Sequence, residues 1–381
     1  VPVATGTTET MLAVSFPDPR TGFAVGADGV VLTTTDGGTT WARGSTGVDD
    51  GLRDVSFVDA THGWAVGGES IVATTDGGRT WVPRPPPPAE SVPAPGPGRP
   101  GSGRVEGWFF IAVHFFDRQR GIVMGAGGAV LLTGDGGLTW TWAGDRSYGL
   151  VMDASFVDGD AGFATGPPSE GPLYTVLQTG DGGRTWQPLT AEGITDVTAV
   201  NFNAVAAPGE GRVYVAGGGG VVLVSADGGG RWGVQRRDTT ETFLSMDFAG
   251  SRGLAVGLTD LGGTSRASLV ATDDGGETWN GRLVDGMVLW DVAFPSPSAA
   301  VAVGCRAFLD AELVVPMVDP ETGEISELKP CTETLVVRIV SEDGEVGGSG
   351  GLPWPVLGAG VAVAVAAAAG VARARRGRRD R

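Results

Sequence analysis

The chain of 381 residues contains 66 glycines but only two cysteines and two histidines, and its formal net charge is −17. Without the six arginines and one aspartate of residues 373–381 the charge would be −22, which argues against nucleic acid or an anionic lipid surface as the ligand. A chain of this length usually indicates two domains, but a ring of repeats grows by adding units to its neighbours and can occupy most of such a chain.

An eight-residue motif, [Ser/Thr]-x-Asp-x-Gly-x-Thr-Trp, occurs six times, once with arginine in place of the second threonine. Its aspartates are Asp36, Asp76, Asp135, Asp181, Asp227 and Asp274, and its tryptophans are Trp41, Trp81, Trp140, Trp186, Trp232 and Trp279. An aspartate at the start of a tight turn accepts hydrogen bonds from the N–H groups that follow, and glycine adopts a positive φ without a steric clash. The tryptophan adds a large apolar surface. Each copy therefore predicts a strand, a turn and a second strand.

Two further landmarks precede most copies of the motif. One is a five-residue segment that begins and ends with glycine, as in residues 22–26 and 63–67, and the other is an upstream phenylalanine. The phenylalanines expected to end a first strand are Phe16, Phe57, Phe115, Phe156, Phe202 and Phe248. The motif aspartates are 40, 59, 46, 46 and 47 residues apart. Repeats of about this length that contain four strands and no helical signal are typical of propeller blades.

A seventh repeat is incomplete. Residues 290–294 and 301–304 keep the first two landmarks, and residues 341–344 keep half of the motif without its tryptophan. Residues 1–16 align with the segment 42–57 that follows the motif elsewhere. We therefore expect an all-β, seven-bladed propeller over residues 1–346, in which an N-terminal strand completes the last blade and removes a free sheet edge.

Four insertions interrupt the repeats. Residues 82–107 are rich in proline and glycine and predict an extended, exposed loop, because such a run cannot join a sheet. The others are residues 167–172, 258–267 and 305–332. All four join strand ends on one face of the ring, and the motif turns lie on the other. Long loops on one side of a rigid scaffold commonly bind ligands, so we expect a protein partner on this long-loop face.

The two cysteines, Cys305 and Cys331, bracket the last insertion. A disulfide between them would close the base of that loop and would indicate an oxidising compartment. The alternative is a pair of buried, reduced thiols.

The C-terminal segment differs in character from the rest. Residues 347–355 form a glycine-rich spacer, residues 356–372 are apolar and uncharged, and residues 373–381 are basic. This order predicts a transmembrane helix with a cytoplasmic tail, which places the propeller outside the cytoplasm, at the cell surface or in the periplasm. It also resembles bacterial sorting signals that a protease removes.

Residues with recognisable catalytic or metal-binding spacing are scarce. His62 and His114 do not form a metal-spaced pair, and we expect structural roles for both. Most motif turns offer one carboxylate, whereas calcium requires six or more oxygen ligands. We therefore expect no metal and no cofactor.

Three aspartates, Asp54, Asp153 and Asp291, share one repeat position at the start of the first strand, which borders the central channel of a propeller. One interpretation is that they bind backbone N–H groups of neighbouring blades. The other is a partial acidic ring that binds a cation or a basic peptide.

The motif together with the Gly-Phe/Trp-Ala-Val-Gly segment resembles the BNR or Asp-box propellers, and most closely the photosystem II stability and assembly factor family and its bacterial relatives. The resemblance covers residues 1–346. It implies a monomeric, non-enzymatic scaffold outside the cytoplasm that binds a protein during assembly or stabilisation of a membrane or exported complex. Similar boxes occur in sialidases and other glycosidases, so a glycan-binding or glycoside-hydrolase propeller is the alternative. Against it, none of Tyr148, Tyr174 and Tyr214, the only tyrosines, lies beside a recognisable partner motif.

Overall fold

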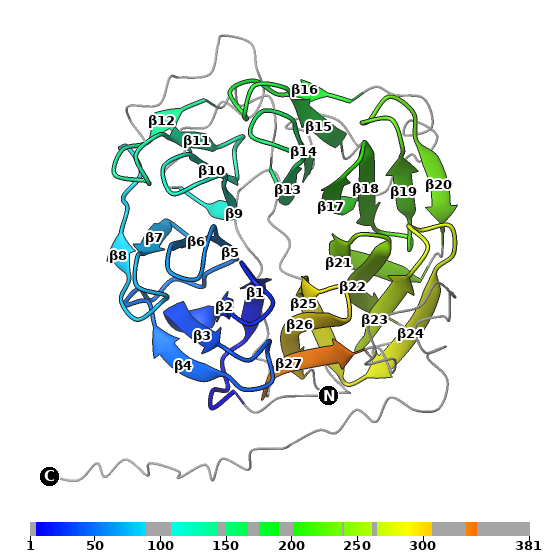
Figure 1. Ribbon diagram of the computed structural model, residues 1–381, viewed down its shortest axis with the longest axis horizontal. Helices are drawn as coiled ribbons and strands as arrows, with labels where there is room; N and C mark the ends of the chain where they lie inside the picture. Colours follow the sequence, from blue (N-terminus) through cyan, green and yellow to red (C-terminus); the bar gives the residue numbers. More distant parts are fainter. Residues whose placement is uncertain are drawn as a thin grey trace, which may run out of the picture.

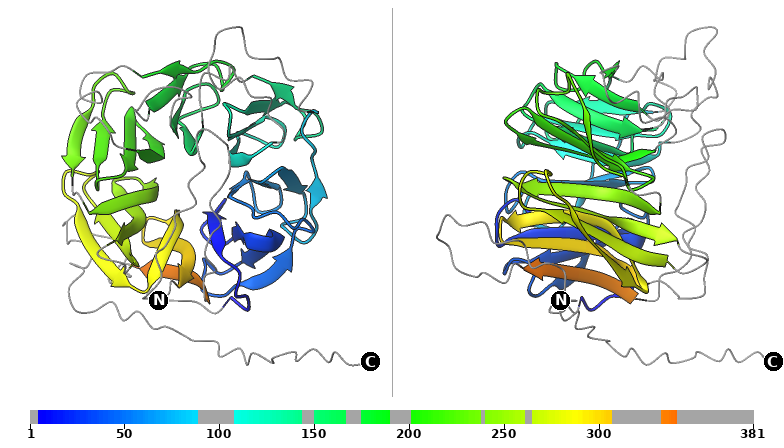
Figure 2. Two further views of the ribbon diagram at one scale, coloured as in Figure 1. Left: turned by 180° about the vertical axis from the view of Figure 1, so that it is seen from behind. Right: turned by 90° about the vertical axis from the view of Figure 1, so that its right-hand side faces the viewer.

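The computed structural model describes residues 5–88, 108–143, 150–166, 175–189, 201–237, 240–260, 265–306 and 333–340. They form seven antiparallel sheets arranged as blades around a central channel (Figure 1). Figure 2 shows the ring from behind and edge-on, with the strands running across its thickness. The prediction of an all-β, seven-bladed propeller is confirmed.

Each blade is a meander whose first strand lines the channel. Blade 1 comprises β1 (Met11–Ser15), β2 (Gly22–Gly26), β3 (Val30–Thr34) and β4 (Ala42–Ser45), with the short 3-10 helix η1 (Ala27–Gly29) between β2 and β3. Blade 2 comprises β5 (Asp54–Phe57), β6 (Gly63–Gly67), β7 (Ser70–Thr74) and β8 (Val82–Pro83). Blade 3 comprises β9 (Phe110–Phe115), β10 (Gly121–Gly125), β11 (Val130–Thr133) and β12 (Thr141–Trp142). Blade 4 comprises β13 (Asp153–Phe156), β14 (Gly162–Gly166), β15 (Thr175–Thr179) and β16 (Gln187–Pro188).

The remaining three blades have longer strands. Blade 5 comprises β17 (Phe202–Gly209), β18 (Arg212–Gly217), β19 (Val222–Ser225) and β20 (Gly233–Arg236). Blade 6 comprises β21 (Glu241–Ala249), β22 (Arg252–Asp260), β23 (Ser265–Thr272) and β24 (Asn280–Asp285). Blade 7 comprises β25 (Met287–Ser296), β26 (Ala299–Arg306) and β27 (Glu333–Val340).

The apolar core is divided among the junctions between blades. Seven hydrophobic clusters occur among the described residues, and each combines side chains of two neighbouring blades. The second strands contribute most, because β2, β6, β10 and β14 are buried along their whole length. Burial of apolar surface therefore stabilises contacts between blades and not separate blades.

The glycines of the second strand have two different packing roles. A Cβ atom on Gly63 would lie 2.4 Å from the ring of Phe57, so the phenylalanine landmark packs flat on this glycine. A Cβ atom on Gly67 would lie 2.1 Å from the carbonyl oxygen of Gly51. The start of the first strand comes this close to the second strand because the pairing of the two strands shifts by one residue near this contact. In blade 1 the shift lies between Met11 and Ala13. Only glycine fits such a backbone contact.

The motif turns have one recurring set of hydrogen bonds. In blade 2, Thr74 Oγ1 donates to Asp76 Oδ1 at 2.9 Å, the Thr80 N–H donates to the same oxygen at 2.9 Å, and Thr80 Oγ1 donates to Oδ2 at 2.6 Å. Gly77 and Gly78 have φ values of 74° and 76°. Blade 5 has Arg231 in place of the threonine and keeps the N–H bond. The predicted strand–turn–strand unit is confirmed.

The ring closes between blades 7 and 1. Arg338 Nε donates to the Gly37 carbonyl at 3.0 Å, and Thr334 Oγ1 donates to the Glu9 carbonyl. Val301, Val303 and Val336 pack against blade 1 in one buried cluster. The described part of blade 7 has three strands, and β1 is the first strand of blade 1. Residues 1–4 lie outside the described residues, so completion of blade 7 by an N-terminal strand stays a prediction.

Two sequence expectations about strand ends were wrong. Phe202 begins β17 and pairs with Gly217, so it is the equivalent of Met11 and not of the phenylalanine that ends a first strand. The insertion expected at residues 258–267 is largely an extension of β22 and β23, which pair as far as Asp260 and Ser265. The first difference arises because blade 5 has Ala207 at the position of the strand-ending phenylalanine, and the second because β22 and β23 of blade 6 continue past the common landmarks.

Other expectations concern segments beyond the described residues. Cys305 is buried in β26, but Cys331 lies outside the described part, so the disulfide stays a prediction. Residues 341–381, which include the spacer, the apolar segment and the basic tail, are also outside it. Within the described residues, no helix has the length and apolar character needed to cross a membrane.

One buried hydroxyl has no hydrogen-bond partner among the described residues. It belongs to Thr165, which is fully buried at a β14 position where β6 has Val66. We expect Thr165→Val to raise the stability by about 1 kcal/mol, because it removes a buried polar group without changing the side chain's shape. Thermal unfolding would test this. Thr179→Val in β15 is the matched control and should destabilise, since the buried Thr179 hydroxyl bonds Asp181 and the Gly183 N–H. An unchanged or lower melting temperature for Thr165→Val would contradict the prediction.

Candidate functional site: the central channel

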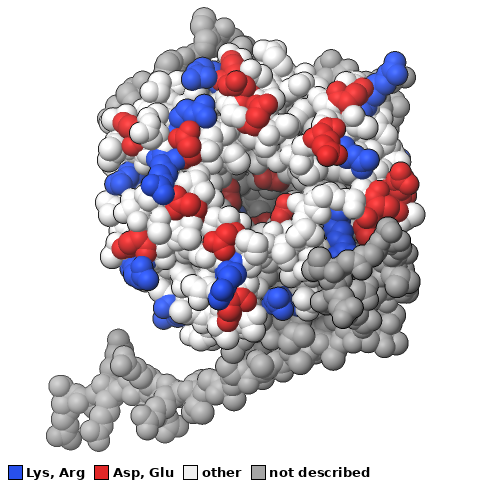
Figure 3. Space-filling model, in the orientation of Figure 1, with Lys and Arg blue, Asp and Glu red and all other residues white. Residues whose placement is uncertain are grey.

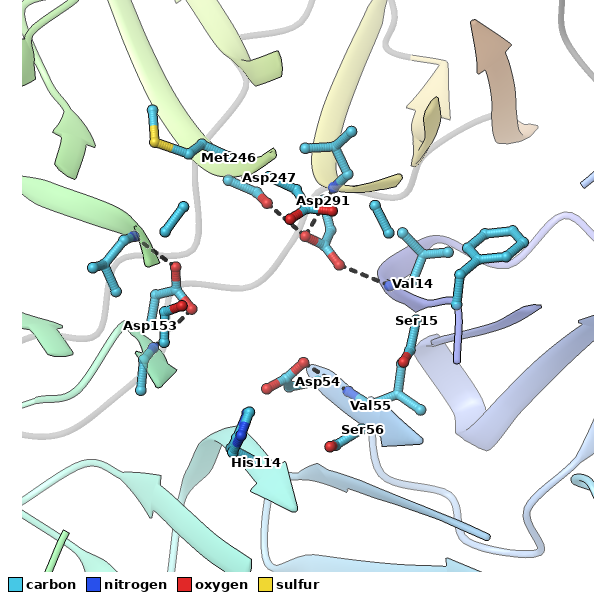
Figure 4. Close-up of a pocket in the computed structure, with 18 of the residues that line it drawn as sticks. Val14, Ser15, Asp54, Val55, Ser56, His114, Asp153, Met246, Asp247 and Asp291 are labelled. Carbon is cyan, nitrogen blue, oxygen red and sulfur yellow. Dashed lines mark hydrogen bonds between the residues drawn. The ribbon is translucent and has the colours of Figure 1, made fainter. Parts of the chain in front are cut away.

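The central channel contains a cavity of about 390 Å³ that is lined by the first strands of all seven blades. Figure 3 shows acidic side chains inside the opening, and Figure 4 shows where the individual side chains lie. The polar residues of the lining are four aspartates, four serines and one histidine, and the other lining residues are apolar. No lysine or arginine occurs among the described residues that line it.

The structure places Asp54, Asp153 and Asp291 in this lining, as the sequence predicts. Each carboxylate accepts one hydrogen bond from its own strand, at 2.7 to 2.8 Å from the next residue's N–H. The second oxygen accepts an N–H from the following blade: Val113 at 2.7 Å, Val205 at 2.8 Å and Val14 at 2.7 Å, respectively. The three aspartates therefore join blades 2 to 3, 4 to 5 and 7 to 1. Binding of a cation or a basic peptide by this ring stays a prediction.

The aspartates never occupy this register position in adjacent blades. The equivalent residues in blades 1 to 7 are Ala13, Asp54, Ala112, Asp153, Ala204, Ser245 and Asp291. Each aspartate reaches a blade that has alanine at this position, which leaves space for the carboxylate and keeps like charges apart. In blade 6, Ser245 Oγ donates to Asp291 Oδ1 at 2.6 Å.

A fourth channel aspartate, Asp247, was not found from the sequence. It accepts the Phe248 N–H at 2.7 Å and the Phe294 N–H of blade 7 at 2.8 Å. It lies two residues further along the first strand, at the position of Ser56 and Ser155, whose hydroxyls accept N–H groups from blades 3 and 5. Residues i and i+2 of a strand share a face, so this alternation in the sequence could have revealed it.

Burial dominates the electrostatics of the channel. It raises the pKa of Asp54 to about 8, that of Asp153 to about 7 and that of Asp247 to about 6, and it also raises the pKa of Asp291. Repulsion by Asp291 raises the pKa values of the other three further. The four aspartates are half-buried, so their side chains are partly exposed to the channel and are otherwise surrounded by protein. Near neutral pH the channel therefore favours the protonated form of Asp54 and a partly protonated Asp153.

The two histidines have structural surroundings. His114 lines the channel, where its ring lies 4.9 Å from those of Phe116 and Phe156, and burial lowers its pKa to about 4. His62 belongs to a turn in which Asp59 accepts its N–H at 2.9 Å. No group of three or more histidine, cysteine or acidic side chains suited to a metal ion occurs within the described ranges.

Comparison with known proteins gives matches among solved structures alone. No protein-family model matches the chain, and no curated protein matches it. A structure of YCF48 bound to D1 peptide is similar with a TM-score of 0.57 and 24% identity, over 81% of this chain and 94% of that one. YCF48 from Cyanidioschyzon merolae gives a TM-score of 0.59 and 18% identity, over 88% and 97%.

The chain has the propeller fold of YCF48. The WD40 repeats of RRP9 are similar to the same degree, with a TM-score of 0.58 at 9% identity over 87% of this chain and 94% of that one. Because a WD40 propeller matches as well as YCF48 does, the likeness demonstrates a shared fold and does not assign a function.

Proposed function

We propose that this propeller binds a protein partner on its long-loop face, and that it assists the assembly or stabilisation of a membrane or exported complex, as a photosystem II assembly factor does. The observation that carries the proposal is the asymmetry of this face. In blades 1 to 5 the second strand ends at the closing glycine, as at Gly67. In blades 6 and 7 it continues to Asp260 and Arg306 and still pairs with the third strand. These two hairpins form a raised wall on one side of the channel mouth.

We infer that the channel mouth on this face is surrounded by one residue from each blade, the one that precedes the register position of Asp54. These residues are Leu12, Arg53, Ile111, Met152, Asn203, Leu244 and Trp290. All seven are half-buried, and five are apolar. A partly exposed apolar ring beside a raised wall is typical of a protein-binding surface, in which large apolar side chains contribute most of the affinity.

The fold comparison supports a protein ligand, since one of the similar propellers, YCF48, is bound to D1 peptide. We further propose that the propeller lies outside the cytoplasm, attached through residues 356–372. The net charge of the chain, the predicted disulfide and the order of spacer, apolar segment and basic tail support this location. Glycan binding or glycoside hydrolysis is the alternative that the experiment below would reveal.

Crosslinking and affinity capture from native membranes would test the proposal. We expect one membrane or exported protein to be recovered with the intact chain, and Leu244→Ala combined with Trp290→Ala to lower its recovery at least about tenfold, because both remove apolar surface at the mouth. Leu138→Ala is the matched control, since this leucine is 67% exposed in a motif turn on the opposite face. Equal recovery with the mouth variant, or retention of the chain on a glycan array without a protein partner, would contradict the proposal.

A further inference from the structure

A second hollow lies between blades 3 and 4, on the face that carries the motif turns. It has a volume of about 530 Å³ and is separate from the channel. Its apolar walls include Phe116, Leu132 and Ala143 of blade 3, and Gly182 of blade 4 lies opposite them. The guanidinium groups of two arginines, Arg120 and Arg184, belong to its lining. Hollows of this size accommodate small molecules.

Blade 3 has a small side chain at one position that borders the hollow. The residue after the second pair of the outer strand is Arg84 in blade 2, Leu189 in blade 4, Gln235 in blade 5 and Arg282 in blade 6, but Ala143 in blade 3 and Gly44 in blade 1. Ala143 belongs to the lining of the hollow.

The larger outer side chains of blades 2, 4 and 5 lie against the motif turn of the blade that follows. The side chain of Arg84 lies beside Gly137, that of Leu189 beside Gly229 and that of Gln235 beside Gly276. At the equivalent Gly183, the neighbouring side chains are those of Ile122 and of Trp186 from the same turn. The hollow between blades 3 and 4 therefore lies where Ala143 replaces the outer side chain of those three blades.

The polar groups of the hollow favour an anion. Arg120 Nε pairs with Asp117 at 2.9 Å, and the guanidinium lies 5.7 Å above the Phe116 ring. Arg184 donates to the Asp181 carbonyl at 2.7 Å and forms no ion pair within the described part of the chain. Its remaining N–H donors are available to a carboxylate, which accepts such bonds strongly.

We propose that the hollow between blades 3 and 4 binds a small aromatic carboxylate. The aromatic ring packs between Phe116 and Leu132, beside the small side chain of Ala143, and the carboxylate lies at Arg184 with Arg120 beside it. This site is on the face opposite the proposed partner surface, so it does not depend on the proposed function.

Saturation-transfer NMR with the full chain and phenylacetate as the probe tests this site. We expect phenylacetate to bind with a dissociation constant in about the millimolar range, and phenylacetamide to bind at least about fivefold more weakly because it lacks the charge. Ala143→Leu introduces the residue that blade 4 has and should abolish binding by filling the hollow. Ala143→Gln, which introduces the residue of blade 5, is a second filling variant. Ala42→Leu, the same change on an exposed outer strand of blade 1, is the control and should leave binding unchanged.

Arg184→Gln separates the charge from the shape of the site. It should remove the preference for phenylacetate over phenylacetamide while a melting curve shows that the chain still folds. The proposal is overturned if no transfer is observed at about 10 mM phenylacetate, or if folded Ala143→Leu and Ala143→Gln bind as well as the parent. Equal binding of the acid and the amide by the parent would overturn the assignment of a carboxylate ligand.

Discussion

Replacing Gly67 by alanine is expected to lower the stability by more than about 4 kcal/mol, or to prevent folding, because a Cβ atom there would lie 2.1 Å from the carbonyl oxygen of Gly51. Gly67 ends β6, and the residues after Gly51 are held by hydrogen bonds from the Leu52 N–H to the Gly26 carbonyl and from the Arg53 N–H to the Val66 carbonyl. Neither side of the contact can therefore move without disrupting the start of blade 2. Soluble expression and thermal unfolding measure the effect.

Gly233→Ala is the matched control for this change. Gly233 begins the outer strand of blade 5, and no heavy atom lies within 4 Å of the position a Cβ atom would take. Its substitution should leave the melting temperature within about 2 °C of the parent value, or raise it slightly through the unfolded chain. A folded Gly67→Ala variant with the parent's melting temperature would show that the strands tolerate the extra atom.

Acidification from pH 8 to pH 5 is expected to raise the melting temperature by about 5 °C or more, opposite to the behaviour of a protein with paired surface carboxylates. Burial and mutual repulsion raise the pKa of Asp54 to about 8 and of Asp153 to about 7, whereas an unfolded aspartate has an ordinary value of 3.8. The folded state therefore binds more protons over this range, so stability falls as pH rises through these values.

The motif turns limit the stability of the protein at low pH. Hydrogen bonds from the motif threonines hold the pKa values of Asp36, Asp76 and Asp135 at about 2. Their stabilisation is present above pH 3.8 and is lost as the pH falls toward 2. We therefore expect maximum stability between about pH 4 and pH 5.

An amide variant isolates the contribution of the channel. Asp54→Asn removes the titrating group, so the rise in melting temperature between pH 8 and pH 5 should be smaller than in the parent. Its amide nitrogen cannot accept the second of the two N–H bonds that Asp54 accepts, so the variant should be less stable than the parent at pH 5. Asp158→Asn in an exposed turn is the control, since the pKa of Asp158 is lowered by hydrogen bonds from the Ala161 and Asp160 N–H groups. A melting temperature that falls between pH 8 and pH 5 would contradict the assignment of protonated carboxyl groups to the channel.

The repeat motif made the fold predictable because its hydrogen bonds are local. Asp76 and its partners lie within six residues of one another, so the sequence contains the whole turn. The paired landmarks are also informative, since Phe57 packs on Gly63 of the adjacent strand. Blade 5 lacks this pair, and Phe202 was for that reason assigned to the wrong end of its strand. A residue type without its packing partner does not fix the register.

The site was less predictable because its contacts are between blades. Asp54 was placed in the channel by its repeat position, but its partner, the Val113 N–H, is 59 residues away. Asp247 was missed because it makes the same kind of contact from a position two residues later. The hollow between blades 3 and 4 lies beside Ala143, where blades 2, 4 and 5 have larger side chains, and this difference is apparent only once the blades are aligned in space.

Two kinds of hydrogen bond from one blade to the next recur where the chain is not continuous. Asp291 holds the Val14 N–H as Asp54 holds that of Val113, and Arg338 binds the Gly37 carbonyl as Trp64 Nε1 binds that of Gly136. The join between blades 7 and 1 is therefore built like an internal junction. Among the described residues this join has the same two kinds of contact as an internal one, so we expect heat or mechanical load to disrupt the ring as one cooperative unit.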